Sequence, residues 1–273
     1  MKASPDLPDS AVFDTHVHVF RRGEGLVEGR RYTPGYDALP EMLLAKMASS
    51  GIGRAILVQP SFLGTDNRFL LSAIEDHPGR FHGVAVTAPD LPGSALAELK
   101  ARGVVGIRLN LIGLPVDDFA SRHGPLLAAL ARQDMVLEIQ AEGVQWQTIL
   151  PVLEQGEARV LIDHFGRTAP GDSSRGFEAL LAAAVRNSAF WFKVSAPYRL
   201  APGMAARCAE RLVGTLGVDR IVWGSDWPAT QFEDRHDYAD TLSWLEEWIP
   251  DADARRQVLG RNPGLLYRFA TIG

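Results

Sequence analysis

The sequence has little cysteine, no long apolar run and no excess of basic residues. Its one cysteine, Cys208, excludes an intrachain disulfide and a cysteine-based metal site, and we expect this side chain to pack in the core. No run of about 18 apolar residues occurs, so we expect no membrane span. The 28 basic and 33 acidic residues give a net charge of −5, which does not indicate a nucleic-acid or anionic-membrane partner.

Two further features that would assign the chain to another class are missing. The polar tail at 1–10, "MKASPDLPDS", has no apolar core of signal-peptide length, so we expect a cytoplasmic location. The segment 21–29, "RRGEGLVEG", contains glycines but no G-x-G-x-x-G pattern that opens a helix, which disfavours a dinucleotide-binding fold. No extended apolar patch stands out on the expected helices, so a monomer and a small homo-oligomer are both open.

Short β-branched or aromatic runs alternate with helix-like stretches along the whole chain. Several of these stretches begin with a capping Asp or Ser and end at Gly. Eight strand–helix alternations without a break in composition predict one (β/α)₈ TIM barrel, a single domain over 1–273. The alternative, a doubly wound open sheet, normally has fewer strands. The expected strands lie at 11–20, 54–61, 81–86, 104–111, 135–140, 159–166, 190–196 and 220–228.

The candidate site consists of the polar side chains at the carboxyl ends of these strands, because the connecting loops of a TIM barrel converge there. In "FDTHVH", His16 and His18 are two residues apart and therefore share one face of the first strand. Three of the seven histidines fall at strand ends, which favours a functional cluster. The candidates are His16, His18, Gln59, Ser61, Arg108, Asn110, Gln140, His164, Arg167, Ser195, Tyr198, Arg199 and Asp226.

Two other features surround the candidate site. The long irregular segment 19–37 follows the histidine pair directly, and its glycines, arginines and tyrosines suggest an active-site loop, with a plain surface loop as the alternative. Lys193 and Glu138 each lie one layer below a strand end. We expect these two side chains to form a buried ion pair in the barrel and not a catalytic amine.

Arginines at three strand ends indicate the charge of the substrate. Arg108, Arg167 and Arg199 keep their charge, and a guanidinium binds a carboxylate through two parallel hydrogen bonds. In an acidic protein, three guanidiniums at one barrel mouth predict a small anionic substrate. The alternative is that one or more of them pair with local acidic residues.

Three motifs resemble those of the amidohydrolase superfamily, amidohydrolase-related family 2. "DTHVH" is similar to its first-strand H-x-H, "IDHFG" to its sixth-strand histidine and "WGSDWP" to its eighth-strand aspartate. "GVVGIRLNL", "LIDHFGR", "KVSAPYR" and "IVWGSDWP" further resemble the branch that contains 2-pyrone-4,6-dicarboxylate hydrolase and the sugar-acid lactonases. The resemblance spans the full chain and implies a TIM-barrel hydrolase.

The sequence departs from the metal-binding members of this superfamily. Arg108 stands where binuclear members have a carboxylated lysine, and Gln140 stands where mononuclear members have a histidine. His16, His18 and Asp226 could still supply the three ligands that one zinc ion needs. We expect a metal-independent site, with one bound zinc or other divalent ion as the alternative.

The resemblance, together with the charge that develops during ester hydrolysis, implies a lactonase. Asp226 would take a proton from the attacking water, and His16 and His18, one or both as donors, would hold the oxyanion. His164 would orient the substrate or the water. The substrate-binding candidates are Arg108, Arg167, Arg199, Gln140, Ser61 and Tyr198.

The identity of the lactone and of the reaction stays open at this stage. The loop at 111–118 has no arginine, so a dicarboxylate and a monoacidic lactone are both candidates. One alternative is a zinc-dependent hydrolase or decarboxylase of an aromatic or semialdehyde acid. The other is a barrel without catalytic activity that binds a ligand.

Overall fold

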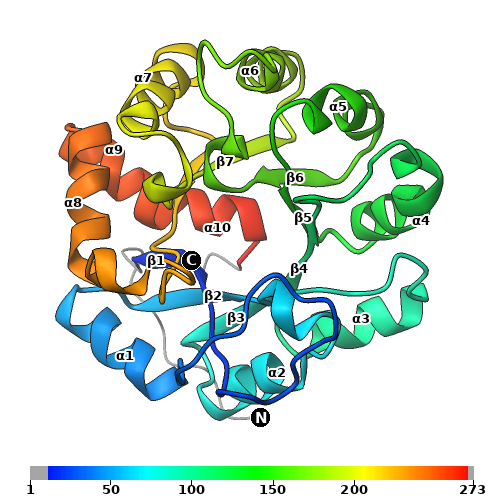
Figure 1. Ribbon diagram of the computed structural model, residues 1–273, viewed down its shortest axis with the longest axis vertical. Coiled ribbons are helices and arrows are strands. Elements are labelled where there is room, and N and C mark those ends of the chain that lie inside the picture. The colour runs from blue at the N-terminus through cyan, green and yellow to red at the C-terminus, as the bar shows by residue number, and fades with distance from the viewer. Residues whose placement is uncertain (1–11, 270–273) are drawn as a thin grey trace.

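A computed structural model describes residues 12–269, so the tail proposed at 1–10 lies outside the described residues. Within these residues, eight parallel strands form one sheet in sequence order, so each strand is hydrogen-bonded to the strands that precede and follow it in the chain. Viewed down the sheet axis, a ring of helices surrounds the strands (Figure 1). This arrangement confirms the predicted TIM barrel. The strands are β1 (Phe13–Val17), β2 (Arg54–Val58), β3 (Phe81–Ala85), β4 (Val104–Asn110), β5 (Val136–Gln140), β6 (Arg159–Ile162), β7 (Phe190–Val194) and β8 (Ile221–Trp223).

The helices cover the outer face of the barrel with their apolar sides. The second helix, for example, buries Leu70, Leu71 and Ile74, and Cys208 is buried in the seventh helix as expected. The helices are α1 (Pro40–Ser49), α2 (Arg68–Asp76), α3 (Gly93–Ala101), α4 (Phe119–Arg132), α5 (Gln145–Gln155), α6 (Gly176–Arg186), α7 (Met204–Leu216), α8 (Tyr238–Trp248), α9 (Ala252–Arg256) and α10 (Asn262–Tyr267). Short helical turns are η1 (Ser61–Leu63), η2 (His164–Arg167), η3 (Pro197–Arg199), η4 (Glu233–Arg235) and η5 (Gln257–Arg261).

The barrel closes where β1 meets the segment that follows β8. Val17 forms a parallel bridge with Trp227, and the His18 N–H donates to the Trp227 carbonyl at 2.8 Å. The Asp226 N–H donates to the His16 carbonyl at 2.9 Å. These backbone bonds place the histidine pair directly beside Asp226. The strands are shorter than the apolar runs predicted, because His18 and Asp226 already belong to the connecting loops.

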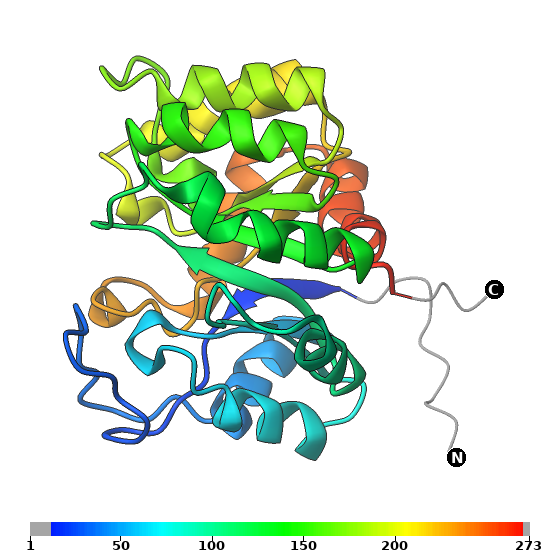
Figure 2. The same cartoon turned by 90° about the vertical axis from the view of Figure 1, so that its right-hand side faces the viewer.

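One end of the barrel is filled by apolar side chains and the other carries the loops. Ile56, Val136 and Val222 form an inner cluster with Leu266 and Tyr267 of α10. Figure 2 shows α10 at the end from which β1 starts, whereas the segment 19–37 lies at the opposite end. The floor of the barrel is therefore packed, and any site that binds a ligand has to lie at the loop end.

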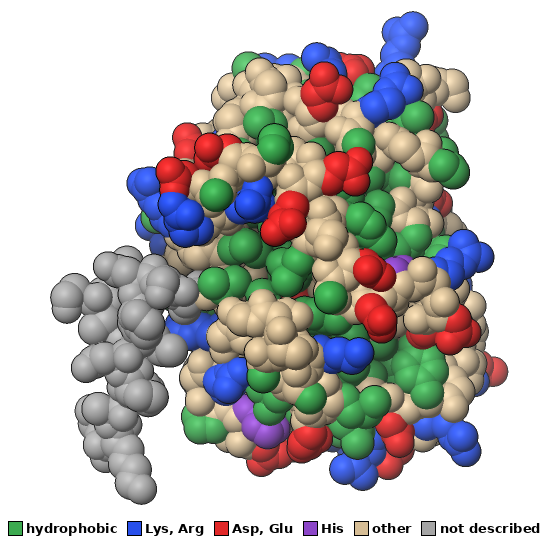
Figure 3. Space-filling model, turned by 90° about the vertical axis from the view of Figure 1, so that its left-hand side faces the viewer, with side chains coloured by type: hydrophobic (Ala, Val, Ile, Leu, Met, Phe, Trp, Pro, Cys, Tyr) green, Lys and Arg blue, Asp and Glu red, His purple; other side chains and the backbone are tan. Residues whose placement is uncertain are grey.

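The surface is mixed in character. Figure 3 shows one face, on which acidic and basic side chains are interspersed among hydrophobic ones. The large hydrophobic side chains that are exposed come from different segments: Met42, Leu114, Val144, Val185 and Leu265. Within residues 12–269, no helix is long and apolar enough to cross a membrane.

Candidate active site

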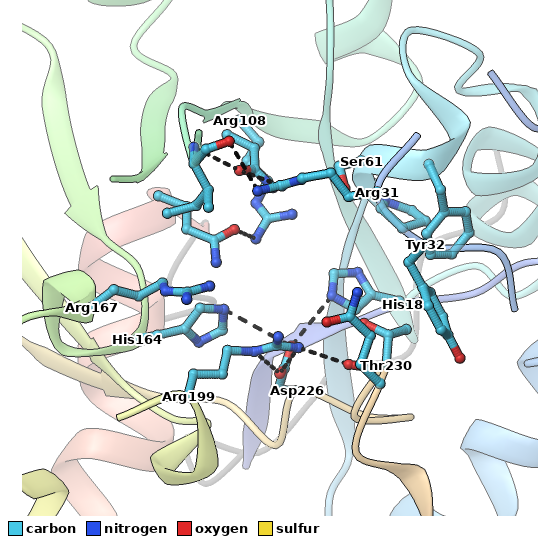
Figure 4. Close-up of a pocket in the computed structure, with 16 residues that line it drawn as sticks. His18, Arg31, Tyr32, Ser61, Arg108, His164, Arg167, Arg199, Asp226 and Thr230 are labelled. Carbon is cyan, nitrogen blue, oxygen red and sulfur yellow. Dashed lines mark hydrogen bonds and ion pairs between the residues drawn. The ribbon is translucent and has the colours of Figure 1, made fainter. Parts of the chain in front are cut away.

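A cavity of about 210 Å³ opens at the carboxyl ends of the strands. Figure 4 shows that its lining side chains come from many different loops and point toward one another. Of the candidates from the sequence, the wall contains His18, Ser61, Arg108, Asn110, Gln140, His164, Arg167, Arg199 and Asp226. The wall also contains residues that sequence reasoning did not single out: Arg31, Tyr32, Pro60, Phe62, Ile112, Thr230 and Gln231.

The centre of the site is one oxygen of Asp226 surrounded by three imidazoles. Oδ1 of Asp226 lies 3.4 Å from Nε2 of His18, 3.5 Å from Nε2 of His16 and 4.0 Å from Nε2 of His164. All four side chains are buried. Among the described atoms, Oδ1 of Asp226 and Nε2 of His16 have no hydrogen-bond partner. Asp226 belongs to the cavity wall, so its carboxylate borders a volume that a water molecule or a reacting group can occupy, whereas His16 lies behind it, outside the wall.

The second oxygen of Asp226 is held by neighbours on η3. Oδ2 accepts hydrogen bonds from the Tyr198 hydroxyl at 2.7 Å and from Nε of Arg199 at 2.9 Å. Burial by itself would raise the pKa of Asp226, but the charge of Arg199 and the neighbouring imidazoles outweigh it and hold the pKa well below its usual range. Asp226 is therefore a fixed carboxylate. Tyr198, expected to bind substrate, is outside the cavity wall and instead donates to this carboxylate.

The local backbone at the site is unusual. His164, Arg167 and Asp226 have positive φ angles of 49°, 48° and 60°, a region that residues other than glycine seldom adopt. Such conformations cost roughly 1–3 kcal/mol each and persist only where the surrounding structure holds them. Here they turn the three side chains into the cavity immediately after a strand ends. The concentration of these conformations at one place is typical of a functional site.

A buried charged layer lies directly beneath the site. The Lys193 ammonium is 2.6 Å from Oε2 of Glu138, 3.0 Å from Oδ1 of Asp163 and 2.8 Å from Nδ1 of His16, and all four side chains are fully buried. The predicted Lys193–Glu138 pair is confirmed. Sequence reasoning missed Asp163, although an acidic residue next to His164 in "LIDHFG" was the available signal.

Burial changes the protonation of groups in this layer. It lowers the pKa of His16 to about 3, and the nearby Lys193 charge adds to this effect, so the imidazole is neutral. Burial raises the pKa of Glu138 to about 7, with a further contribution from the Asp163 charge. Desolvation also holds the pKa of His164 well below its usual range. His16 and His164 therefore act as neutral imidazoles near pH 7.

The three predicted arginines line the cavity and also contact local acidic residues. Nη2 of Arg108 donates to Asp163 at 3.1 Å and to Oε1 of Gln140 at 2.8 Å. Arg199 pairs with Asp226 at 2.8 Å, whereas Arg167 makes only a longer contact of 3.5 Å with the half-buried Glu142. The two interpretations of these arginines, ligand binding and local pairing, are therefore both compatible with the geometry. Arg167 has the weakest protein partner of the three.

A fourth arginine comes from the segment 19–37. Nη1 of Arg31 donates to the Ile112 carbonyl at 3.0 Å and Nη2 donates to Oδ1 of Asn110 at 3.1 Å, so the segment reaches the loop after β4. Within residues 12–269, no acidic side chain pairs with Arg31. The same segment is tied to the loop after β8, because the hydroxyls of its two tyrosines both donate to Oε1 of Glu233 at 2.5 Å.

Two of the remaining sequence candidates have structural partners. The Gln59 amide donates to the Asp66 carbonyl at 2.8 Å and orders the turn after β2. Ser195 bonds to Nδ1 of His164 at 2.8 Å and thereby orients that imidazole. Ser61 and Gln140 belong to the cavity wall.

In the part of the chain that the structure describes, two groups of residues have the types and spacing that could hold a metal ion: His16, His164 and Asp226, and His16, Glu138 and Asp163. In the second group, the Lys193 ammonium already contacts all three members. In the first group, and in the set His16, His18 and Asp226 predicted from the sequence, the one carboxylate is already paired with Arg199. A divalent ion would therefore lie among guanidiniums without an uncompensated negative charge. The donors converge, but the surrounding charge does not fit a divalent ion.

A barrel with a histidine–carboxylate centre at the carboxyl ends of its strands is typical of hydrolytic enzymes. The family model described as amidohydrolase matches residues 13–269. The chain belongs to this amidohydrolase family, as its motifs suggested.

The chain is similar to proteins with named activities. It is 30% identical to a 4-sulfomuconolactone hydrolase of Hydrogenophaga intermedia, over 93% of this chain and 88% of the relative. It is also 30% identical to a 2-pyrone-4,6-dicarboxylate hydrolase of Comamonas testosteroni, over 96% and 91% of the two chains. A crystal structure of a probable 2-pyrone-4,6-dicarboxylic acid hydrolase of Acinetobacter baumannii with citric acid bound has 31% identity and a TM-score of 0.89, and the match covers 95% of this chain and all of that one.

Proposed function

We propose that the protein hydrolyses the ester bond of a small anionic lactone without using a metal ion. The observation that carries this proposal is the free oxygen of Asp226, which faces three imidazoles at the floor of a cavity lined by arginines. Two of the similar proteins are named as hydrolases of a lactone or a pyrone, and these names support the same reaction. We treat 1–273 as one catalytic domain, and its cytoplasmic location and oligomeric state stay predictions from the sequence.

The arginines favour a substrate with two acidic groups. Arg31 supplies the guanidinium that the loop 111–118 lacks, which removes the sequence-based objection to a dicarboxylate. Glu142 is near both Arg31 and Arg167, but it contacts Arg167 only at 3.5 Å and forms no ion pair with Arg31, so an incoming anion can pair with both. A second acidic group can be held by Arg108, with Gln140 and Ser61 contacting the neighbouring polar atoms.

The chemistry follows from where charge develops. A water molecule next to Oδ1 of Asp226 attacks the lactone carbonyl and gives a proton to this carboxylate. At least one imidazole N–H stabilises the negative charge that forms on the carbonyl oxygen, and Arg199 stabilises the charge of Asp226. The ring C–O bond then breaks, and the proton passes from Asp226 to the leaving oxygen. Because Asp226 is a weak base with a low pKa, the site suits an activated ester and not an amide.

The zinc-dependent decarboxylase and hydrolase interpretation is the alternative reaction. It requires a divalent ion on His16, His18 and Asp226. The pairing of Asp226 with Arg199 and the contact of Lys193 with His16 disfavour that ion. A barrel that only binds its ligand would not need a buried carboxylate oxygen without a hydrogen-bond partner beside three imidazoles.

The test is turnover of lactones by enzyme stripped with chelator. The panel contains 2-pyrone-4,6-dicarboxylate, sugar-acid lactones and a neutral lactone. We expect turnover to survive stripping, and Asp226→Asn to lower kcat by roughly 10²–10⁴-fold, the usual contribution of a general base. Asp90→Asn, a change of an exposed aspartate outside the site, serves as the matched control. Turnover that is lost on stripping and returns with zinc would overturn the metal-free proposal.

A further inference from the structure

The two histidines of the H-x-H motif have Nδ1 atoms that are held by groups of opposite character. Nδ1 of His16 lies 2.8 Å from the Lys193 ammonium, which can only donate hydrogen bonds. Nδ1 of His18 lies 2.7 Å from the Val58 carbonyl, which can only accept one. A neutral imidazole carries one N–H and one lone pair, so the partner at Nδ1 decides what Nε2 presents to the site.

The surroundings of Lys193 support the role of its ammonium as the donor. It donates hydrogen bonds to Oε2 of Glu138 at 2.6 Å and to Nδ1 of His16 at 2.8 Å, and it forms an ion pair with Oδ1 of Asp163 at 3.0 Å. The alternative is an N–H on Nδ1 of His16 that donates to Glu138 or Asp163. The distances from Nδ1 to these carboxylates are longer, 3.3 Å to Oε1 of Glu138 and 3.4 Å to Oδ1 of Asp163. The shorter contact favours an Nδ1 that accepts.

We propose that His16 and His18 form a polarised pair, in which His16 presents an N–H at Nε2 and His18 presents a lone pair at Nε2. Lys193 and the Val58 carbonyl are the positioning groups that set this difference. The sequence left open whether one or both histidines donate. The polarised pair assigns donation to His16 alone, and it rests on the proposed lactone hydrolysis for the reaction that it serves.

Each histidine then has a separate task in the attack on the carbonyl. The lone pair of His18 and Oδ1 of Asp226, 3.4 Å apart, both accept hydrogen bonds from the attacking water and hold it in place. The water oxygen bonds to the carbonyl carbon, and its proton moves to Asp226. The N–H of His16 donates to the carbonyl oxygen as the electron pair moves there. The pair therefore separates holding of the nucleophile from stabilisation of the oxyanion.

The first experiment reads the two tautomers by long-range ¹H–¹⁵N NMR of protein labelled at histidine, without substrate. His16→Gln and His18→Gln identify the two sets of signals. We expect the proton on Nε2 in His16 and on Nδ1 in His18, so that each residue serves as the internal comparison for the other. The same tautomer in both residues, or the proton on Nδ1 of His16, would overturn the proposal.

The second experiment removes the ammonium. Lys193→Met is expected to move the His16 proton to Nδ1, where Glu138 or Asp163 accepts it, and to leave His18 unchanged. The loss of the donor lowers kcat by roughly 10²–10³-fold, the usual effect of losing one oxyanion donor, while KM changes little. Because Lys193→Met also leaves two buried carboxylates without their cation, the double variant Lys193→Met with Glu138→Gln is measured beside it.

The outcomes separate the polarised pair from the proposed function. Lys100→Met, a change of an exposed lysine, is the control and is expected to change neither tautomers nor kcat. A His16 tautomer that stays the same in both Lys193 variants would refute the positioning role of Lys193. The absence of lactone turnover in the wild-type protein would refute the proposed function, while the NMR result still decides the tautomers.

Discussion

Arg31 offers a direct test of how the site recognises its substrate. Its guanidinium projects from the segment 19–37 into the cavity wall, and no acidic side chain among residues 12–269 neutralises it. A hydrogen bond between ionic groups is worth about 1.5–3 kcal/mol when buried and less when exposed, and Arg31 is exposed in the free protein. We therefore expect Arg31→Gln to remove about 1–2 kcal/mol of substrate binding, a roughly 5- to 30-fold loss in kcat/KM.

The assay compares a lactone with two acidic groups and a lactone with one. We expect the loss in Arg31→Gln to lie mainly in KM, to be larger for the diacid and to shrink at high salt. The neighbouring Arg30 is a matched control, since it bonds within its own segment to Thr33 and Val27 and is outside the cavity wall. Equal losses for Arg30→Gln and Arg31→Gln, or an equal loss on a neutral lactone, would refute a role of Arg31 in recognising the anion.

Three further predictions concern the scaffold around the site. Gly224→Ala would place a methyl carbon 2.5 Å from Cβ of His16, so we expect a loss of about 1–3 kcal/mol in thermal unfolding and a lower kcat; an unchanged melting temperature would contradict this close packing. Burial raises the pKa of Asp14 to about 6, so the folded state binds an extra proton between the ordinary pKa of 3.8 and 6 and stability falls as the pH rises through this window. The shift corresponds to a fall of about 3 kcal/mol in the free energy of unfolding. Urea unfolding of the wild-type protein and of Asp14→Asn at pH 4 and 7 should show that this fall is absent in the variant. Glu233→Gln weakens the attachment of the segment 19–37, so we expect KM to rise more than kcat falls and proteases to cut the segment faster.

The barrel could be predicted from the sequence because its evidence is local. Each strand is a short apolar run, and each helix has its own periodicity and end signals, so no long-range contact was needed to count eight repeats. The ends of the strands were less certain. His18 and Asp226 continue apolar runs in sequence, yet they leave the ladder because backbone bonds between His18 and Trp227 close the barrel at that level. Such closure depends on residues about 200 positions apart.

The same division between local and distant information applies to the site. His16, His18, His164 and Asp226 could be found from strand ends and motifs. Arg31 could not, because its place depends on how an irregular segment of 19 residues folds across the mouth and finds the loop after β4. The Lys193–Glu138 pair was predictable from strand alternation. The contact of Lys193 with His16 was not, because the two residues are far apart in the sequence and only the closed barrel brings them together.

The arginine-lined mouth also has a consequence for what happens after the chemical step. Opening a lactone creates a new carboxylate, so the product carries one more negative charge than the substrate. The four guanidiniums that line the cavity, in a protein of net charge −5, are expected to hold this product more strongly than the substrate. Release of the ring-opened acid is thus expected to limit turnover at low salt.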